Sequence, residues 1–430
     1  MSKKKLLTRE VWAYGLYDWA NSAFVMTVTT AFFPAFFKRF WCVGVDETIS
    51  TARLGYGNMA AGLVIALCSP LLGAFAGAGK SKKRLLAVFM TIGACMAGVL
   101  YLIPQGNWLG ALGVFLAGRI GFSLANLFYD SLLVDVSDNE NADRVSSFGY
   151  GIGYLGCGLL FAVHLLMYQM PQLFGIKDGA TAIRIAFVTV MIWWILFSLP
   201  ILTMVKQREA PKQEGPREVV MDGLRRLRHT TADILQNRNM LLFLVAYWCY
   251  IDGVHTVYMM ATDFGLSLGI DTGMLMVALL CVQFVAFPSA IGFGALAGRI
   301  GAKKAILIAV GIYLFITIVG AWILKTAVDF FVLACLTGVA QGAAQALSRS
   351  FFAKMVPPEK AADYFGFYNL MGKFAVVLGP GIVATANLIG RALHFHGSAS
   401  SRFGITTLAV MFVIGGGLLL KVKEPQSSGG

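Results

Sequence analysis

Polar side chains interrupt the first apolar stretch of this sequence at helical spacing. The stretch runs from about Val11 to Phe37 and contains Asp18, Asn21 and Ser22. Residues three and four positions apart share one face of a helix. An apolar run of this length can cross a bilayer, which takes about 20 residues. Because a charge inside a bilayer is costly, we expect this face to look into a helix bundle or a wet cavity, where it can bind a polar solute or a proton.

A second polar face of the same kind begins at Asp252, near the middle of the chain. His255 and Thr256 follow it at spacings of three and four. A histidine titrates near neutral pH, so a carboxylate and an imidazole one helical turn apart can pass a proton. We interpret Asp252 and His255 as candidates for proton coupling. A hydrogen-bonded core histidine is the structural alternative.

Acidic and basic side chains within the expected spans balance each other, which favours pairing between helices, because a lone buried charge costs several kcal/mol. Asp130 and Arg349 lie toward the same end of their spans. We predict that they form a gating charge pair between the two halves of the chain; pairing of each within its own half is the alternative. The intramembrane charges are Asp18, Asp130, Asp252, Arg119, Arg349 and Lys373.

A mixed set of carboxylate, ammonium, amide and phenol groups suits a small zwitterion, such as an amino acid or a short peptide. For any one of the tyrosines, core packing is the alternative, since aromatic residues are abundant here. The predicted substrate-binding residues are Asp18, Asn21, Tyr17, Tyr154, Gln341, Gln345, Asn369 and Lys373.

The composition is that of a polytopic membrane protein. Of the 430 residues, 57% are hydrophobic and 13% are charged, and the mean hydropathy is +0.71. Soluble domains carry about 25% charged residues. The net charge of +13 lies mostly between apolar runs, which favours anionic lipid headgroups as partners over nucleic acid. The seven cysteines are scattered without metal-ligand spacing, so we expect no metal and no disulfide framework.

Twelve apolar runs predict an all-α protein of twelve transmembrane helices in two six-helix bundles. Residues 1–204 form the first bundle, residues 205–238 a linker, and residues 239–430 the second bundle. The linker has an apolar helical stripe, which predicts an amphipathic helix on the membrane surface; a flexible linker is the alternative. Basic residues recur on one side of the spans, which predicts that both termini are cytoplasmic. The first apolar run is too long for a cleavable signal peptide.

The two halves repeat each other. The stretch 72–77 with the basic turn Lys82-Lys83 matches 293–298 with Lys303-Lys304 without a gap. Such a repeat predicts two pseudo-symmetric bundles with a site at their interface. The stretch 78–81, Ala-Gly-Lys-Ser, is no phosphate-binding loop, because it follows a membrane helix and lacks the first glycine of that motif.

The six-plus-six plan with a basic turn after spans two and eight resembles the major facilitator superfamily. Within it, three stretches resemble the vacuole-effluxer-like subfamily, which includes autophagy-related vacuolar amino-acid exporters and bacterial relatives. These stretches are Tyr-Asp-Trp-Ala-Asn-Ser at 17–22, Arg-Val-Ser-Ser-Phe-Gly-Tyr-Gly-Ile-Gly-Tyr at 144–154, and 341–350 continuing to 365–373. The superfamily turn usually carries an aspartate where Gly77 and Gly298 stand here, which places its usual charge relay in doubt.

The resemblance implies a secondary transporter that works by alternating access. It also implies Arg119 as a third candidate for proton coupling, because the superfamily often has an arginine near mid-membrane that is tied to proton movement. An arginine that braces backbone carbonyls is the structural alternative. We expect proton coupling, a small-molecule substrate, a monomer in the lipid bilayer, no cofactor and no enzyme activity, and we favour a bacterial inner membrane. A lipid or amphiphile flippase is the alternative within transporters. A non-transporting sensor or assembly factor is the alternative outside them, although a scaffold needs no charges at membrane depth.

Overall fold

The computed structural model describes residues 7–78, 82–207, 216–267, 270–324, 326–392 and 398–425. Within these ranges the regular structure is helical. The first half contains α1 (Arg9–Ala23), α2 (Phe33–Phe36), α3 (Glu47–Ala78), α4 (Lys82–Val99), α5 (Trp108–Ser131), α6 (Leu133–Val136), α7 (Ala142–Gln169) and α8 (Gly179–Met204). After α9 (Pro216–Gln236) come α10 (Arg238–Ser267), α11 (Thr272–Ile300), α12 (Ala302–Trp322), α13 (Ala327–Met355), α14 (Ala361–Ala392) and α15 (Ser398–Lys421).

The first membrane helix runs without a break from Arg9 to Trp41, but part of it is wound as a π-helix. Thr8 caps its start by accepting a hydrogen bond from the Val11 amide at 3.2 Å. The turns Phe24–Phe32 and Phe37–Trp41 are π-helical. Turns of this kind are rare and occur frequently at functional sites. Here they coincide with a part of the helix that is rich in aromatic residues.

Ten helices are long and apolar enough to cross a membrane, counted over the described residues alone. They correspond to the first ten predicted spans. The last two predicted spans coincide with α14 and α15, of which α15 contributes a shorter apolar stretch over Thr406–Lys421. The fold class predicted from the apolar runs is confirmed as an all-helical membrane bundle.

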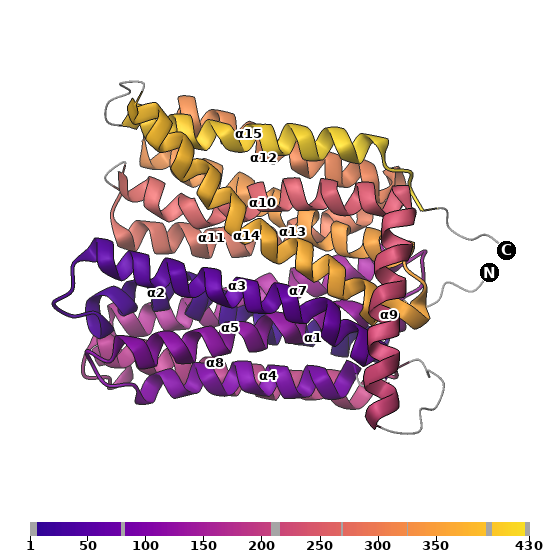
Figure 1. Cartoon of the computed structure of the whole chain (residues 1–430). Coiled ribbons are helices and arrows are strands. Elements are labelled where there is room, and N and C mark those ends of the chain that lie inside the picture. Colours follow the sequence, from indigo (N-terminus) through magenta and orange to yellow (C-terminus); the bar gives the residue numbers. More distant parts are fainter. Residues whose placement is uncertain are drawn as a thin grey trace.

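The helices form two bundles that lie side by side, the first half below and the second half above in Figure 1. The bundles meet where α3 packs along α14 and where α7 packs along α11. Glycine permits the close approach of α3 and α14: a Cβ atom at Gly73 would lie 2.5 Å from the Ala362 carbonyl oxygen, and one at Gly366 would lie 2.7 Å from the Ser69 carbonyl oxygen. These contacts fix the relative position of the two halves.

Helix α9 lies across one end of the bundle, roughly perpendicular to the long helices (Figure 1). We call this the α9 end. Of the two alternatives for the linker, the structure has the helix, over Pro216–Gln236. The sequence predicts that both chain termini are cytoplasmic. The termini themselves, residues 1–6 and 426–430, lie outside the described residues. The described chain begins and ends near the α9 end.

Candidate functional site

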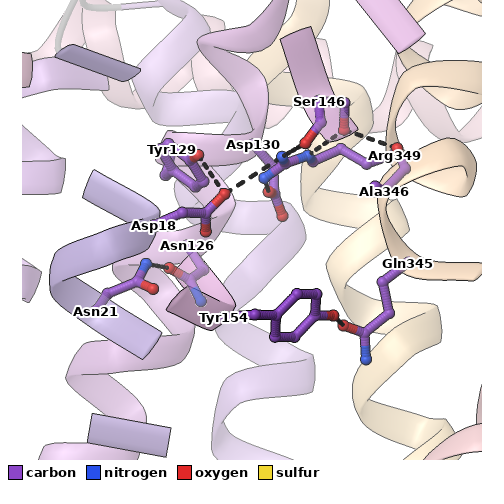
Figure 2. Close-up of polar contacts among 10 residues, drawn as sticks. All are labelled: Asp18, Asn21, Asn126, Tyr129, Asp130, Ser146, Tyr154, Gln345, Ala346 and Arg349. Atoms are coloured by element: carbon purple, nitrogen blue, oxygen red, sulfur yellow. Dashed lines mark hydrogen bonds and ion pairs between the residues drawn. The ribbon is translucent and has the colours of Figure 1, made fainter. Parts of the chain in front are cut away.

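Arg349 of α13 lies at the centre of a polar network between the two halves (Figure 2). Its side chain is 1% exposed. One terminal nitrogen, Nη1, lies 3.1 Å from Asp130 Oδ1 of α5, and the other, Nη2, lies 3.4 Å from Asp18 Oδ2 of α1. Its Nε donates to Ser146 Oγ at 2.9 Å, and Nη2 also donates to the Ser146 carbonyl oxygen at 3.1 Å. Every one of these partners belongs to the first half.

The second carboxylate of this network, Asp18, is also fixed by a phenol. Tyr129, the residue before Asp130, donates its hydroxyl to Asp18 Oδ2 at 2.6 Å. Aromatic rings surround the guanidinium carbon of Arg349, at 4.3 Å from the centre of Tyr150 and 5.1 Å from that of Tyr129. Cations over such faces are attracted by the ring quadrupole. Two carboxylates, a hydroxyl and three rings, counting Tyr14 at 5.4 Å, therefore hold one buried cation.

A second cross-half contact lies closer to the α9 end. Asp143, at the start of α7, accepts from Lys354 Nζ at 2.5 Å and from Ser350 Oγ at 2.7 Å. Lys354 follows Arg349 by five positions on α13, about 7.5 Å along the helix at 1.5 Å per residue. Ser146 adds a bond to the Ala346 carbonyl oxygen at 2.7 Å. The halves are thus joined by two layers of charged contacts at this end.

Neutral polar groups form a further layer on the other side of Arg349, away from the α9 end. Tyr154 of α7 donates to Gln345 Oε1 of α13 at 3.1 Å, across the two halves, and Asn21 of α1 donates to Asn126 of α5 at 2.8 Å (Figure 2). Gln345 lies one helical turn before Arg349, about 6 Å deeper. Amides and a phenol next to a buried cation form a site that can hydrogen-bond a small polar solute.

The remaining predicted substrate residues are placed as follows. Tyr17 is fully buried in the first half, with its ring 4.7 Å from that of Tyr129. Asn369 of α14 is 8% exposed, and Gln341 of α13 lies one turn beyond Gln345. The side chain of Lys373 lies outside the described residues. The structure thus brings Asp18, Asn21, Tyr154 and Gln345 into neighbouring layers, with Asp18 bound to Arg349 and not to Asn21.

Two of the three residues predicted for proton coupling share helix α10, and the third lies in the first half. Asp252 is fully buried in α10, and His255 is half-buried one turn further on. Arg119 of α5 donates to Asn58 Oδ1 of α3, inside the first half. Their part in proton movement stays a prediction.

A carboxylate lies beside Gly77, one of the two glycines at positions where the superfamily turn usually carries an aspartate. A Cβ atom at Gly77, near the end of α3, would collide with Asp363 Oδ1 of α14. Asp363 also lies 3.7 Å from Arg226 of α9. At the equivalent Gly298 of the second half, the nearest atom to a Cβ would be Arg144 Nη2 at 3.6 Å, an ordinary contact. The carboxylate beside the basic turn of the first half therefore belongs to α14, in the second half.

Sequence reasoning missed several residues of this site, among them Tyr129, Ser146, Asn126 and Asp143. Asn126 lies one turn before Asp130, and Ser146 and Asp143 lie in and beside the motif at 144–154. Asn126 shares the helical face of Asp130, so the spacing of three and four could have indicated it. For Tyr129 and Asp143 no sequence signal distinguishes them from other residues at span ends.

Solved structures of known transporters share this architecture. The proton:xylose symporter XylE bound to 6-bromo-6-deoxy-D-glucose aligns with a TM-score of 0.70 at 14% identity, covering 97% of this chain and 95% of that chain. The human organic anion transporter MFSD10 (TETRAN) aligns with a TM-score of 0.67 at 13% identity, covering 97% of this chain and all of that one (100%). At such low identity the likeness shows the fold, which is that of the major facilitator superfamily.

Sequence comparison gives the family. The uncharacterized MFS-type transporter YxiO of Bacillus subtilis is 38% identical over 427 residues, covering 99% of this chain and 97% of that protein. Autophagy-related protein 22-2 of Aspergillus clavatus is 24% identical over 268 residues, which are 56% of this chain and 42% of that longer protein. Residues 55–428 match the family described as vacuole effluxer Atg22 like. The chain belongs to this family: it is a multi-pass membrane protein of the major facilitator type and a secondary transporter, and the predicted resemblance is confirmed.

Proposed function

We propose that this protein moves a small polar or zwitterionic solute, an amino acid or a short peptide, by alternating access with proton coupling. The observation that carries the proposal is the Arg349 network, because it joins the two halves through buried charges at one end of the bundle. An arginine with two carboxylates and adjacent amides offers partners for both the carboxylate and the ammonium group of a zwitterion. The solute would compete with these groups and so loosen the contact between the halves.

In this proposal the α9 end faces the cytoplasm of a bacterium, because exposed lysines gather there, as they do on the inner side of membrane proteins. Lys304 of α12 and Lys421 of α15 are both exposed at helix ends on this side. The two charged layers then close the inner gate, and the bound solute reaches the network from the outer side. Asp252 is the proposed proton site, since it is a fully buried carboxylate on α10, one helical turn before His255.

Transport into proteoliposomes tests the proposal. A thermal-shift screen of amino acids and dipeptides on the purified chain first identifies a ligand, since a ligand that binds the folded state raises its apparent stability. Uptake of the labelled ligand is then measured with and without a pH gradient. Accumulation that needs the gradient supports a proton-coupled solute transporter. Gradient-independent equilibration contradicts the coupling, and movement of labelled lipid between leaflets without solute uptake supports a flippase in its place.

A further inference from the structure

Helix α9 has an inner face that is fixed to the bundle. Gly223 lies so close to Phe75 of α3 that a Cβ atom there would collide with the ring. Thr230 and Ile234, seven and eleven positions further on, are 2% and 5% exposed. Because small and buried residues hold one side of α9 against the bundle, the opposite side of the helix faces its surroundings.

The described acidic residues of α9, Asp222 and Asp233, are both paired. Asp222 lies 2.7 Å from Arg226 of the same helix, and Arg226 reaches Asp363 of α14. Asp233 lies 3.5 Å from Lys360 and accepts from the Tyr364 hydroxyl at 3.2 Å. The described negative charges of this helix are therefore paired with cations of α9 itself and of the bundle.

The outer face of α9 combines exposed apolar groups with arginines. Met221 is 63% exposed, Leu224 52% and Leu235 62%. Arg225 and Arg228 are exposed between them, and neither forms an ion pair within the part of the chain that the structure describes. Positions 221, 224, 225, 228 and 235 recur at helical spacing, so these side chains lie on one side of the helix. We define these five residues as the outer face of α9.

We propose that the outer face of α9 docks on the anionic phospholipid headgroups of the adjacent leaflet. The helix axis crosses the long helices at the end of the bundle, so it runs in the plane of the bilayer surface (Figure 1). A helix in this plane inserts its apolar side chains at the boundary of headgroups and acyl chains, and its arginines bind the phosphates. Charge complementarity selects an anionic lipid, since the described acids of the helix are already paired and Arg225 and Arg228 are exposed.

The docking has a consequence for the gate. Arg226, on the same helix, binds Asp363 of α14, and α14 packs on α3 of the other half. A lipid that holds α9 in place holds this contact between the halves as well. The inference depends on the chain spanning a membrane and not on its cargo, so its test needs no substrate.

Hydrogen exchange of the intact protein in lipid nanodiscs tests this inference. Exchange at the amides of α9 is compared in discs of phosphatidylcholine and in discs that also contain phosphatidylglycerol at one part in four. Each basic residue near an anionic surface contributes about fivefold to the binding constant. We expect at least about fivefold slower exchange over 221–236 in the anionic discs, and loss of this difference in the variant R225Q/R228Q.

The variant K304Q/K421Q is the matched control, because it removes two exposed positive charges at the same end without touching α9. It should keep the lipid effect. Equal exchange in the two kinds of disc, or an undiminished lipid effect in R225Q/R228Q, would overturn the inference. Equal loss of the slowing in both variants would also overturn the inference. The lipid effect would then depend on the overall charge at this end of the protein and not on the outer face of α9.

Discussion

The guanidinium of Arg349 lies 3.1 Å from the carboxylate of Asp130, although 219 residues separate them in the chain. One belongs to each half, so this ion pair spans the interface that must open for alternating access. Arg349 is nearly fully buried, and its second carboxylate, Asp18, shares the same cation. Breaking a buried pair by removing one partner typically costs about 3–5 kcal/mol, because a charge is left uncompensated. The closed arrangement at the α9 end therefore depends on this one cation more than on any single surface pair.

Charge exchange between the two residues tests whether they act together. Asp130→Arg and Arg349→Asp should each reduce transport by at least about tenfold, and the double swap should restore it in part. Restoration should stay partial because the swapped aspartate would lie beside Asp18 and Ser146 instead of binding them. Initial uptake rates in proteoliposomes measure this. Equal rates in the single and double variants would show that the pair is not coupled.

The contact between Asp143 and Lys354 should stabilise the closed α9 end less than the Arg349 network does. Lys354 is 16% exposed, so water compensates part of its charge when its partner is lost. Asp143→Asn keeps a group that accepts from Ser350 but removes the charge that binds Lys354. We expect about 1 kcal/mol less stabilisation of the closed end, or about fivefold more opening.

Labelling of a cysteine at Ser147, a buried position of α7 beside Gly294, reports this opening. In a background without the native cysteines, the maleimide reaction should be about fivefold faster in Asp143→Asn. The increase should be larger in Arg349→Met. An unchanged rate in Asp143→Asn would mean that the second layer does not hold the halves together.

The two equivalent glycines of the repeat should tolerate substitution differently. Gly77→Ala places a methyl group against Asp363 Oδ1, whereas Gly298→Ala meets only Arg144 Nη2 at 3.6 Å. A forced shift in a packed interface typically costs about 1–3 kcal/mol. Gly77→Ala should therefore lower the melting temperature and speed labelling at position 147, and Gly298→Ala should do neither. Identical behaviour of the two variants would contradict a close contact between Asp363 and α3.

Asp252 provides the test of proton coupling. Asp252→Asn should abolish accumulation driven by a pH gradient but spare counterflow exchange, which needs no net proton movement. Asp18→Asn should weaken both, because it removes a partner of Arg349 and Tyr129. Gradient-driven accumulation by Asp252→Asn would place the coupling site elsewhere.

The spans could be predicted because apolar length alone defines them: α8 ends at Met204, the last residue expected for the first bundle. The pairing of Asp130 with Arg349 followed from charge balance within the spans. The partners Ser146 and Tyr129 could not be predicted, since a serine and a tyrosine in a helix give no signal of which neighbour they face. Nor could the sequence show that Asp18 binds Arg349, because helical periodicity places a side chain on a face without fixing what packs against it. The contact of Asp363 with Gly77 depends on the docking of α14 on α3, which only tertiary structure shows.

The distance between the two halves at the α9 end tests the central claim most directly. Glu140 and Glu359 are exposed positions in opposite halves. Pulsed electron paramagnetic resonance between spin labels at these two positions measures the distance on the purified protein in nanodiscs. We predict one short distance population for the parent chain and a second, longer population in Arg349→Met, where Asp18 and Asp130 lose their shared cation and repel each other. Asp130→Asn, which keeps one carboxylate, should show a smaller fraction of the long distance. The same single distribution in all three proteins would contradict the account.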